Sequence, residues 1–165
     1  MRTLRAVGGV CLSVGLTIGL VAQAEARCGD APGDAAAVAA ARDDVETTCD
    51  CAGAATHGAY VSCAAGVANA RAEANLLPHN CKGQVKRCAA RSTCGKPGAV
   101  TCCRTSARGT TRCSIKASAS LCSTPPHGGA ACVGTATSCC DACNESGCAG
   151  SPSSAFVMGL EPAGF

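Results

Sequence analysis

The chain has 165 residues, a formal net charge of +3 and 17 cysteines, but no tryptophan, one tyrosine and two phenylalanines. So few large aromatic side chains exclude an extensive aromatic core, and cross-links must supply much of the stability instead. A cysteine content of about 10% is typical of a small disulfide scaffold.

Residues 1–26 are typical of a secretory signal peptide. Arg2 and Arg5 precede an apolar stretch over residues 6–22, and two small-residue cleavage sites follow it. Four glycines interrupt the stretch and no basic stop-transfer cluster follows, which argues against a membrane anchor. The sequence therefore predicts export, with Cys11 removed together with the signal.

Cleavage after Ala26 leaves sixteen cysteines, an even number that fits complete pairing in an oxidising compartment. We expect one disulfide-rich domain over residues 28–148 and then a poorly ordered tail over residues 149–165, which contain several Ser, Pro and Gly. The connectivity stays open, since sixteen cysteines allow about 2 million pairings. The cysteines predicted to form disulfides are Cys28, Cys49, Cys51, Cys63, Cys81, Cys88, Cys94, Cys102, Cys103, Cys113, Cys122, Cys132, Cys139, Cys140, Cys143 and Cys148.

Two helices are predicted at the start of this domain. Asp34 is a good N-cap for a helix over residues 35–47, where apolar residues recur at helical spacing. A second helix is expected over residues 58–73, because four residues recur at i, i+3, i+4 and i+7 and would form one buried stripe. The stripe consists of Tyr60, Cys63, Ala64 and Val67.

A third helix is predicted over residues 81–91, with Asn80 as its cap. Its inner stripe would hold Cys81, Val85 and Cys88, which leaves the basic residues of the helix on its other faces. The first half of the domain is therefore expected to be a set of short helices joined by disulfides.

After the third helix, β-branched and small polar residues become frequent, and residues 99–116 predict a hairpin with a four-residue turn. If Thr105 pairs with Thr110, Cys102 lies opposite Cys113 and both are buried. The predicted fold class is α+β, a small disulfide-rich domain in which short N-terminal helices precede one or two cystine-linked β-hairpins.

The neighbouring Cys102 and Cys103 would point to opposite sides of their strand, so we expect them to bond to different partners. In the predicted register, Arg112 and Lys116 share the solvent-facing side of the hairpin. A shift of one residue would exchange the two faces.

Charge is distributed unevenly along the chain, with net −4 over residues 27–50, +9 over residues 71–116 and −3 after residue 116. These segments either neutralise one another or leave a basic surface for an anionic polysaccharide or a membrane surface. The basic segment has no aromatic residue for base stacking, which argues against sequence-specific recognition of single-stranded nucleic acid. The candidate anion-binding residues are Lys82, Lys86, Arg87, Arg91, Arg108, Arg112 and Lys116.

Two cysteine motifs have the spacing of metal or redox sites, Cys-Asp-Ala-Cys over residues 140–143 and Cys-Asp-Cys over residues 49–51. In an exported chain, oxidation to disulfides competes with metal binding, and no thioredoxin-like pattern surrounds either motif. We therefore expect neither a metal site nor a cofactor.

Three histidines, His57, His79 and His127, lie near a helix start or in loops, and none has a histidine partner at i+4. The chain also lacks the G-x-S-x-G elbow of many serine hydrolases. No catalytic residue is predicted. A small secreted hydrolase stays an alternative, and it would need a histidine within hydrogen-bond reach of a serine or an acid in a cleft.

Three short motifs resemble those of uncharacterised cysteine-rich secreted bacterial proteins: Cys94-Gly95-Lys96-Pro97-Gly98, Thr101-Cys102-Cys103 and Ser138-Cys139-Cys140-Asp141-Ala142-Cys143. The resemblance covers about residues 44–143 and implies export and one continuous cysteine framework, but no known activity. The sequence thus favours a secreted or cell-surface binding module whose ligand, on the charge pattern, is anionic.

Overall fold

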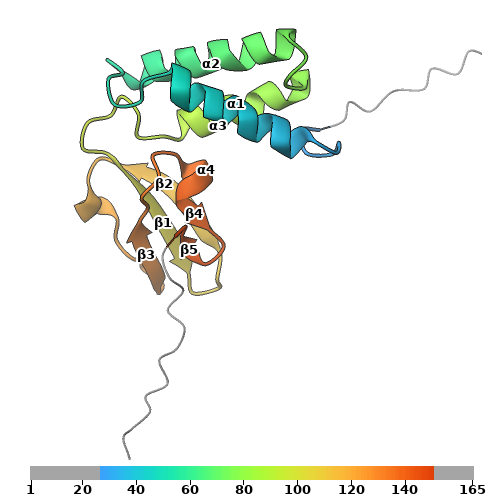
Figure 1. The fold of residues 1–165 in the computed structure, drawn as a ribbon. Helices are drawn as coiled ribbons and strands as arrows, with labels where there is room; N and C mark the ends of the chain where they lie inside the picture. Colours follow the sequence, from blue (N-terminus) through green and yellow to red (C-terminus); the bar gives the residue numbers. More distant parts are fainter. Residues whose placement is uncertain (1–26, 151–165) are drawn as a thin grey trace, which may run out of the picture.

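The structure is a computed structural model that describes residues 27–150. The predicted signal peptide, residues 1–26, and all but two residues of the predicted tail, 149–165, lie outside the described residues. Helices come first in the described chain and small antiparallel sheets follow (Figure 1). The predicted fold class, a small α+β disulfide-rich fold, is confirmed.

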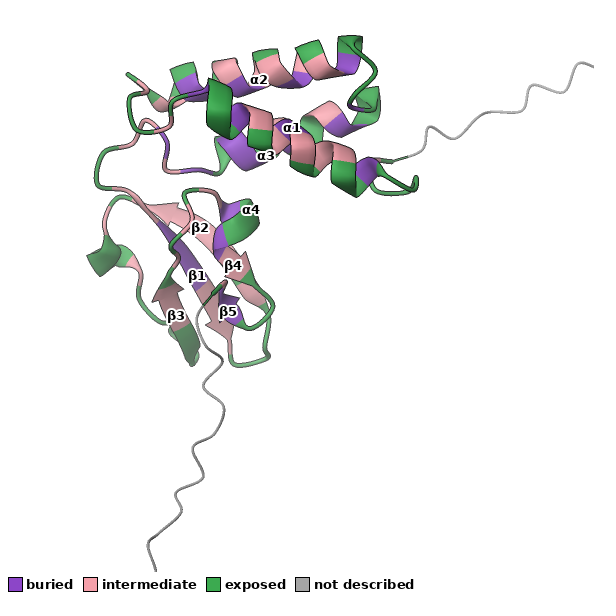
Figure 2. Cartoon of the chain, viewed as in Figure 1, coloured by how far each residue is buried: buried purple, intermediate pink, exposed green. Residues whose placement is uncertain are grey.

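Three helices form the helical half: α1 (Asp34–Thr48), α2 (His57–Glu73) and α3 (Lys82–Ala90). Each begins and ends within one residue of its predicted bounds. Their buried sides face one another (Figure 2), and the residues there are mostly small. The fully buried residues of this contact are mostly alanines: Ala41, Ala64 and Ala68 are all 0% exposed.

Two predicted helix caps are wrong in detail. Asp34 is the first residue of α1, after Gly33 in a left-handed conformation, and its carboxylate accepts hydrogen bonds from Gly29 N at 2.8 Å and Ala31 N at 3.4 Å. Asn80 lies inside a 3-10 turn, η1 (His79–Cys81), so that Cys81 precedes α3. In both cases the preceding segment turns tightly, which residue preferences for caps do not anticipate.

The sheet half contains a three-stranded antiparallel sheet in the order β2-β1-β3. Its strands are β1 (Val100–Ser106), β2 (Thr111–Lys116) and β3 (Gly129–Val133). A 3-10 turn, η2 (Ala119–Leu121), lies between β2 and β3. After them come the short helix α4 (Cys139–Ala142) and a small hairpin of β4 (Cys143–Asn144) and β5 (Gly147–Cys148).

The predicted register of the main hairpin is wrong by one residue. Thr105 pairs with Thr111, and Cys113 lies opposite Cys103. The cause lies in the turn, where Gly109 has φ 79° and its N–H donates to Ser106 O at 2.9 Å. The connection between Thr105 and its partner is therefore one residue longer than the predicted four-residue turn. A three-residue loop that ends on a left-handed glycine forms such a bulge.

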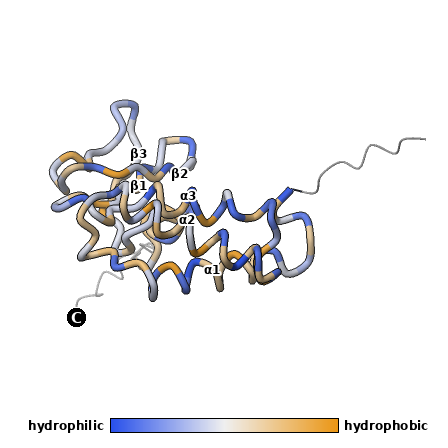
Figure 3. Tube along the Cα trace, turned by 90° about the horizontal axis from the view of Figure 1, so that it is seen from above, coloured by the Kyte–Doolittle hydropathy of each residue, from blue (hydrophilic) through white to orange (hydrophobic). Residues whose placement is uncertain are grey.

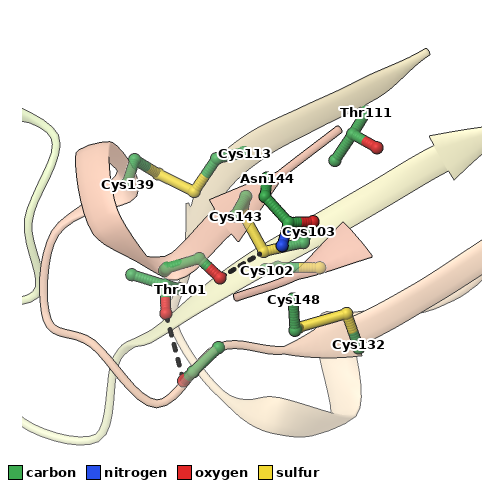
Figure 4. Close-up of a disulfide and its surroundings, with 12 residues drawn as sticks. Thr101, Cys102, Cys103, Thr111, Cys113, Cys132, Cys139, Cys143, Asn144 and Cys148 are labelled. Carbon is green, nitrogen blue, oxygen red and sulfur yellow. Dashed lines mark hydrogen bonds between the residues drawn. A yellow bond between two sulfur atoms is a disulfide. The ribbon is translucent and has the colours of Figure 1, made fainter. Parts of the chain in front are cut away.

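This register fixes which side chains share a face of the sheet. Thr111 Oγ1 lies 2.9 Å from Thr105 Oγ1 and donates to Glu145 O at 2.8 Å, so their face is covered by β4 and β5 (Figure 4). Thr101 is buried on this covered face and donates to the carbonyl oxygens of Gly134 and Ala136. The alternate residues point to the opposite side, which we call the outer face: Val100, Cys102, Arg104 and Ser106 of β1, and Arg112, Ser114 and Lys116 of β2.

All sixteen cysteines of residues 28–148 lie in eight disulfides. Three of these bonds lie in the helical half, four in the sheet half and one between the halves. As predicted, the neighbouring Cys102 and Cys103 have different partners. The disulfides are Cys28–Cys81, Cys49–Cys63, Cys51–Cys94, Cys88–Cys140, Cys102–Cys122, Cys103–Cys143, Cys113–Cys139 and Cys132–Cys148.

The two halves meet where α3 leads into the sheet half, and the helices extend away from the sheet on one side (Figure 3). Cys88–Cys140 joins α3 to α4, and Arg42 of α1 forms an ion pair with Asp141 of α4. Backbone bonds add to the junction, since Cys139 N donates to Arg91 O at 2.9 Å. The halves are therefore linked by covalent, ionic and backbone contacts.

Candidate anion-binding surface

Most basic side chains of the described chain have no acidic partner. Among residues 27–150 the ion pairs are Arg42–Asp141 and Arg71–Asp44, and neither contains a candidate anion-binding residue. The acidic segment of α1 therefore does not neutralise the predicted surface through ion pairs. Arg71–Asp44 does join the acidic segment 27–50 to the basic segment 71–116, so the alternative in which the two segments cancel each other is supported at this one ion pair of the described chain.

The first group of candidates lies on α3. The helix buries Val85, Cys88 and Ala89, which leaves Arg87 and Arg91 exposed. Lys82 and Lys86 are half-buried. The Arg91 guanidinium donates to Cys113 O on β2 at 2.8 Å, so the end of this group touches the sheet half.

The second group lies on the main hairpin. Arg108 is exposed in the turn, Arg112 is exposed on the outer face, and Lys116 is half-buried on that same face. The structure adds a residue that sequence reasoning missed, because Arg104 of β1 lies directly opposite Arg112. Recognition of the glycine bulge at the turn would have given the correct register and revealed this pair.

The two groups approach each other at one place. A shallow, open depression beside β2 is lined by Arg91 from the first group and Arg112 from the second, together with Glu145, which pairs with neither. Lys82 lies nine positions before Arg91, on the order of 13 Å along a helix axis. The candidates thus form two adjoining groups with one contact region.

The segment that carries the hairpin group contains only cationic charges, although Glu145 from outside this segment lines the same depression as Arg112. Residues 92–140 contain Lys96, Arg104, Arg108, Arg112 and Lys116 but no Asp or Glu. Arg104 Nε is buried and has no hydrogen-bond partner. Buried polar groups in folded proteins are nearly always paired, so this atom is an exception within the described chain, and its burial keeps an external acceptor from reaching it.

The cysteine motifs considered for metal or redox chemistry are divided among different bonds. Cys140 bonds to Cys88 and Cys143 bonds to Cys103, so the two cysteines of the Cys-Asp-Ala-Cys motif are not bonded to each other. Sulfur atoms of Cys103, Cys132 and Cys148 lie close together but also belong to disulfides. A disulfide sulfur is not the thiolate that binds metals.

The His57 ring hydrogen-bonds to backbone carbonyl oxygens through both of its nitrogens. His57 Nδ1 lies 2.9 Å from Cys94 O and its Nε2 lies 3.1 Å from Ala90 O, so this ring joins α2 to the segment after α3. Within residues 27–150 no hydrogen bond connects a histidine to a serine hydroxyl or a carboxylate. The geometry required by the hydrolase alternative is thus not observed in this part of the chain.

No helix within residues 27–150 has the length and apolarity needed to span a bilayer. A search among protein families, curated proteins and solved structures finds no match to this chain.

Proposed function

We propose that the chain is a secreted or cell-surface binding module that attaches to an acidic polysaccharide through its basic surface. The surface consists of the α3 group and the hairpin group, Arg104 included. Eight disulfides suit an oxidising, extracellular location, and the predicted signal peptide would deliver the chain there.

One observation carries the proposal: a run of 49 residues, 92–140, holds five cations and no carboxylate. A surface built from such a segment attracts polyanions by its summed field, and none of its five cations is held in an ion pair within the described chain. Arg104, Arg112 and Lys116 lie on strands that disulfides cross-link, so the backbone that carries them is already ordered before a ligand binds.

An acidic polysaccharide fits this surface better than a membrane. Membrane-binding surfaces combine cations with exposed aromatic or large apolar residues that enter the interface. Here Tyr60, the one aromatic residue of the described chain, is buried, so the surface offers no aromatic anchor to a membrane interface. Charge without an aromatic anchor suits a hydrated polyanion.

The test is binding of the exported, fully oxidised protein to heparin and to vesicles of phosphatidylglycerol. We expect heparin binding at 0.1 M salt, where the Debye length is about 10 Å, and its loss towards 1 M, where it is about 3 Å. A variant with Lys82, Lys86, Arg87 and Arg112 changed to Gln should bind much more weakly.

A matched control changes the net charge by the same amount elsewhere. Arg27→Gln combined with Ala35→Glu, Ala36→Glu and Ala39→Glu alters four exposed positions at the far end of the helical half. This control should keep most of the affinity. Absence of heparin binding at low salt, or equal weakening by control and variant, would refute the proposed surface.

A further inference from the structure

We propose that Arg104 and Arg112 together form a guanidinium clamp that binds one sulfate or carboxylate group of the polysaccharide. The inference rests on the proposed function and assigns the specific contact to two residues of the outer face. A general basic surface would need only charge, whereas a clamp needs the planar donor geometry of arginine.

The register places the two side chains together. Arg104 and Arg112 are directly opposite in the β1–β2 ladder, so they project from the same face. Their neighbours Thr105 and Thr111 are hydrogen-bonded to each other on the covered face, which confirms that the arginines point the other way. On the other side of Arg104 lies Ala131 of β3, whose side chain is too short to cover a guanidinium.

The two charges are not neutralised within the fold. No carboxylate occurs in residues 92–140, and neither arginine forms an ion pair with the acids of the described chain. Like charges directly opposite each other destabilise a sheet. An oxyanion between the two guanidinium groups would remove the repulsion and accept hydrogen bonds from their terminal nitrogens, since the Arg104 Nε atom is buried and cannot be reached from solvent.

The surroundings of the clamp fit an extended ligand. Arg112 and Lys116 are four residues apart on β2, which spans about 13 Å of strand, and Arg108 precedes them in the turn. Arg112 and Lys116 share the outer face, and Arg108 lies at the turn beyond it. A linear polyanion laid along β2 would meet these cations in succession, with the clamp at the middle step.

The experiment separates the effect of positive charge from the effect of the forked donor geometry of arginine at positions 104 and 112. Arg104→Lys with Arg112→Lys keeps the charge and removes the forked donors, whereas Arg104→Gln with Arg112→Gln removes both. Lys82→Gln with Lys86→Gln removes the same charge as the Gln double variant but from the α3 group of the same surface, and serves as the control for loss of charge alone. Binding is measured by calorimetry at 0.15 M salt, with a heparin oligosaccharide and with an oligogalacturonate that carries carboxylates only.

We expect both arginine double variants to lose about tenfold or more in affinity, because hydrogen bonds to charged groups are strong. The α3 control should lose less than about threefold in affinity. The two oligosaccharides separate a sulfate clamp from a carboxylate clamp. A second readout is independent of the ligand: without it, the Gln double variant should melt at least as high as the unmodified protein, because the cross-strand repulsion is gone.

Each contrary result has a defined meaning. If the unmodified protein binds neither oligosaccharide even at low salt, the proposed function fails. If it binds, but the Lys double variant lies within about threefold of it or the α3 control loses as much as the arginine variants, the clamp alone is overturned. Arg112→Lys by itself, at an exposed position, repeats the comparison should a double variant fail to fold.

Discussion

Gly95 lies where the chain leaves α3 and passes against the beginning of α2. Its φ is +67°, and its N–H donates to Cys51 O at 3.3 Å. A Cβ atom at this position would lie only 2.5 Å from His57 N and 2.4 Å from the carbonyl carbon of Thr56. Backbone, rather than a flexible side chain, blocks the space, so the position requires glycine both for its conformation and for its closeness to the neighbouring segment.

Gly95→Ala should therefore lower the free energy of unfolding by at least about 2 kcal/mol, through left-handed strain and the backbone clash together. The control is Gly66→Ala in α2, where nothing lies within 4 Å of the added methyl group. That change should stabilise by up to about 1 kcal/mol, because alanine is the better helix former. Thermal melting of the oxidised proteins measures both, and equal melting temperatures would contradict the close approach.

Tyr60, the only tyrosine, is buried in the helical half. Burial raises the pKa of its phenol above 10.0, the nearby Glu46 carboxylate raises this pKa further, and Arg42 opposes the shift. A group with a raised pKa in the folded state contributes stability below its unfolded pKa and loses it as the pH rises towards the folded pKa. Stability should thus begin to fall above about pH 10.

Absorbance at 295 nm reports this ionisation directly, because no tryptophan is present. The midpoint of the native protein should lie above that of the reduced, denatured chain. Glu46→Gln should move the native midpoint down while the denatured midpoint stays in place. Coincident native and denatured midpoints would show that the phenol is hydrated in the folded state.

At the scale of elements, the helices could be predicted because their signals are local. The repeated apolar positions of 58–73 and the cysteines of 81–91 lie on single helix faces, and the bounds agree within one residue. The hairpin was predicted in place but not in register, since one left-handed glycine, Gly109, adds a residue to the turn. That single shift also hid Arg104, so the candidate surface was incomplete for the same reason.

The disulfide connectivity could not be predicted, because partners come from elements that only packing brings together. Cys88 and Cys140 are 52 residues apart and meet where α3 contacts α4. No spacing rule selects that pair over the other possible pairings.

Removal of this bond by Cys88→Ala with Cys140→Ala should destabilise the protein by about 4 kcal/mol, since the chain-entropy model relates the cost to a loop of 52 residues. The comparison is Cys132→Ala with Cys148→Ala, which opens a loop of 16 residues inside the sheet half, at about 3 kcal/mol. Urea unfolding gives both values. A cost below about 1 kcal/mol for the first variant would mean that the remaining contacts dock the halves unaided.

For the whole molecule, the apolar core is small and divided. One buried cluster lies among the helices, and a second consists of Cys103, Ala142 and Cys148. The largest fully buried side chains are Leu77 and Val85, followed by Thr101 and cysteines. Burial of such small groups removes little area from water, so the disulfides carry a large share of the stability.

Full reduction should therefore unfold the described chain. Far-ultraviolet circular dichroism in a strong reductant should show loss of helix and no cooperative melt, while the oxidised protein melts cooperatively. Alkylation before reduction is the control and should label none of the sixteen cysteines of residues 28–148. A cooperative melt after complete reduction would show that packing alone supports the fold.

The order of the disulfides along the chain has a consequence for how the protein reaches its native state. None of the eight bonds joins two cysteines that follow each other in the sequence: even the shortest, Cys49–Cys63, encloses Cys51. A reduced chain that oxidises its nearest neighbours first would form only non-native bonds. Correct pairing then depends on thiol–disulfide exchange, so renaturation should succeed in a glutathione redox buffer or with a disulfide isomerase, and give scrambled isomers under rapid air oxidation.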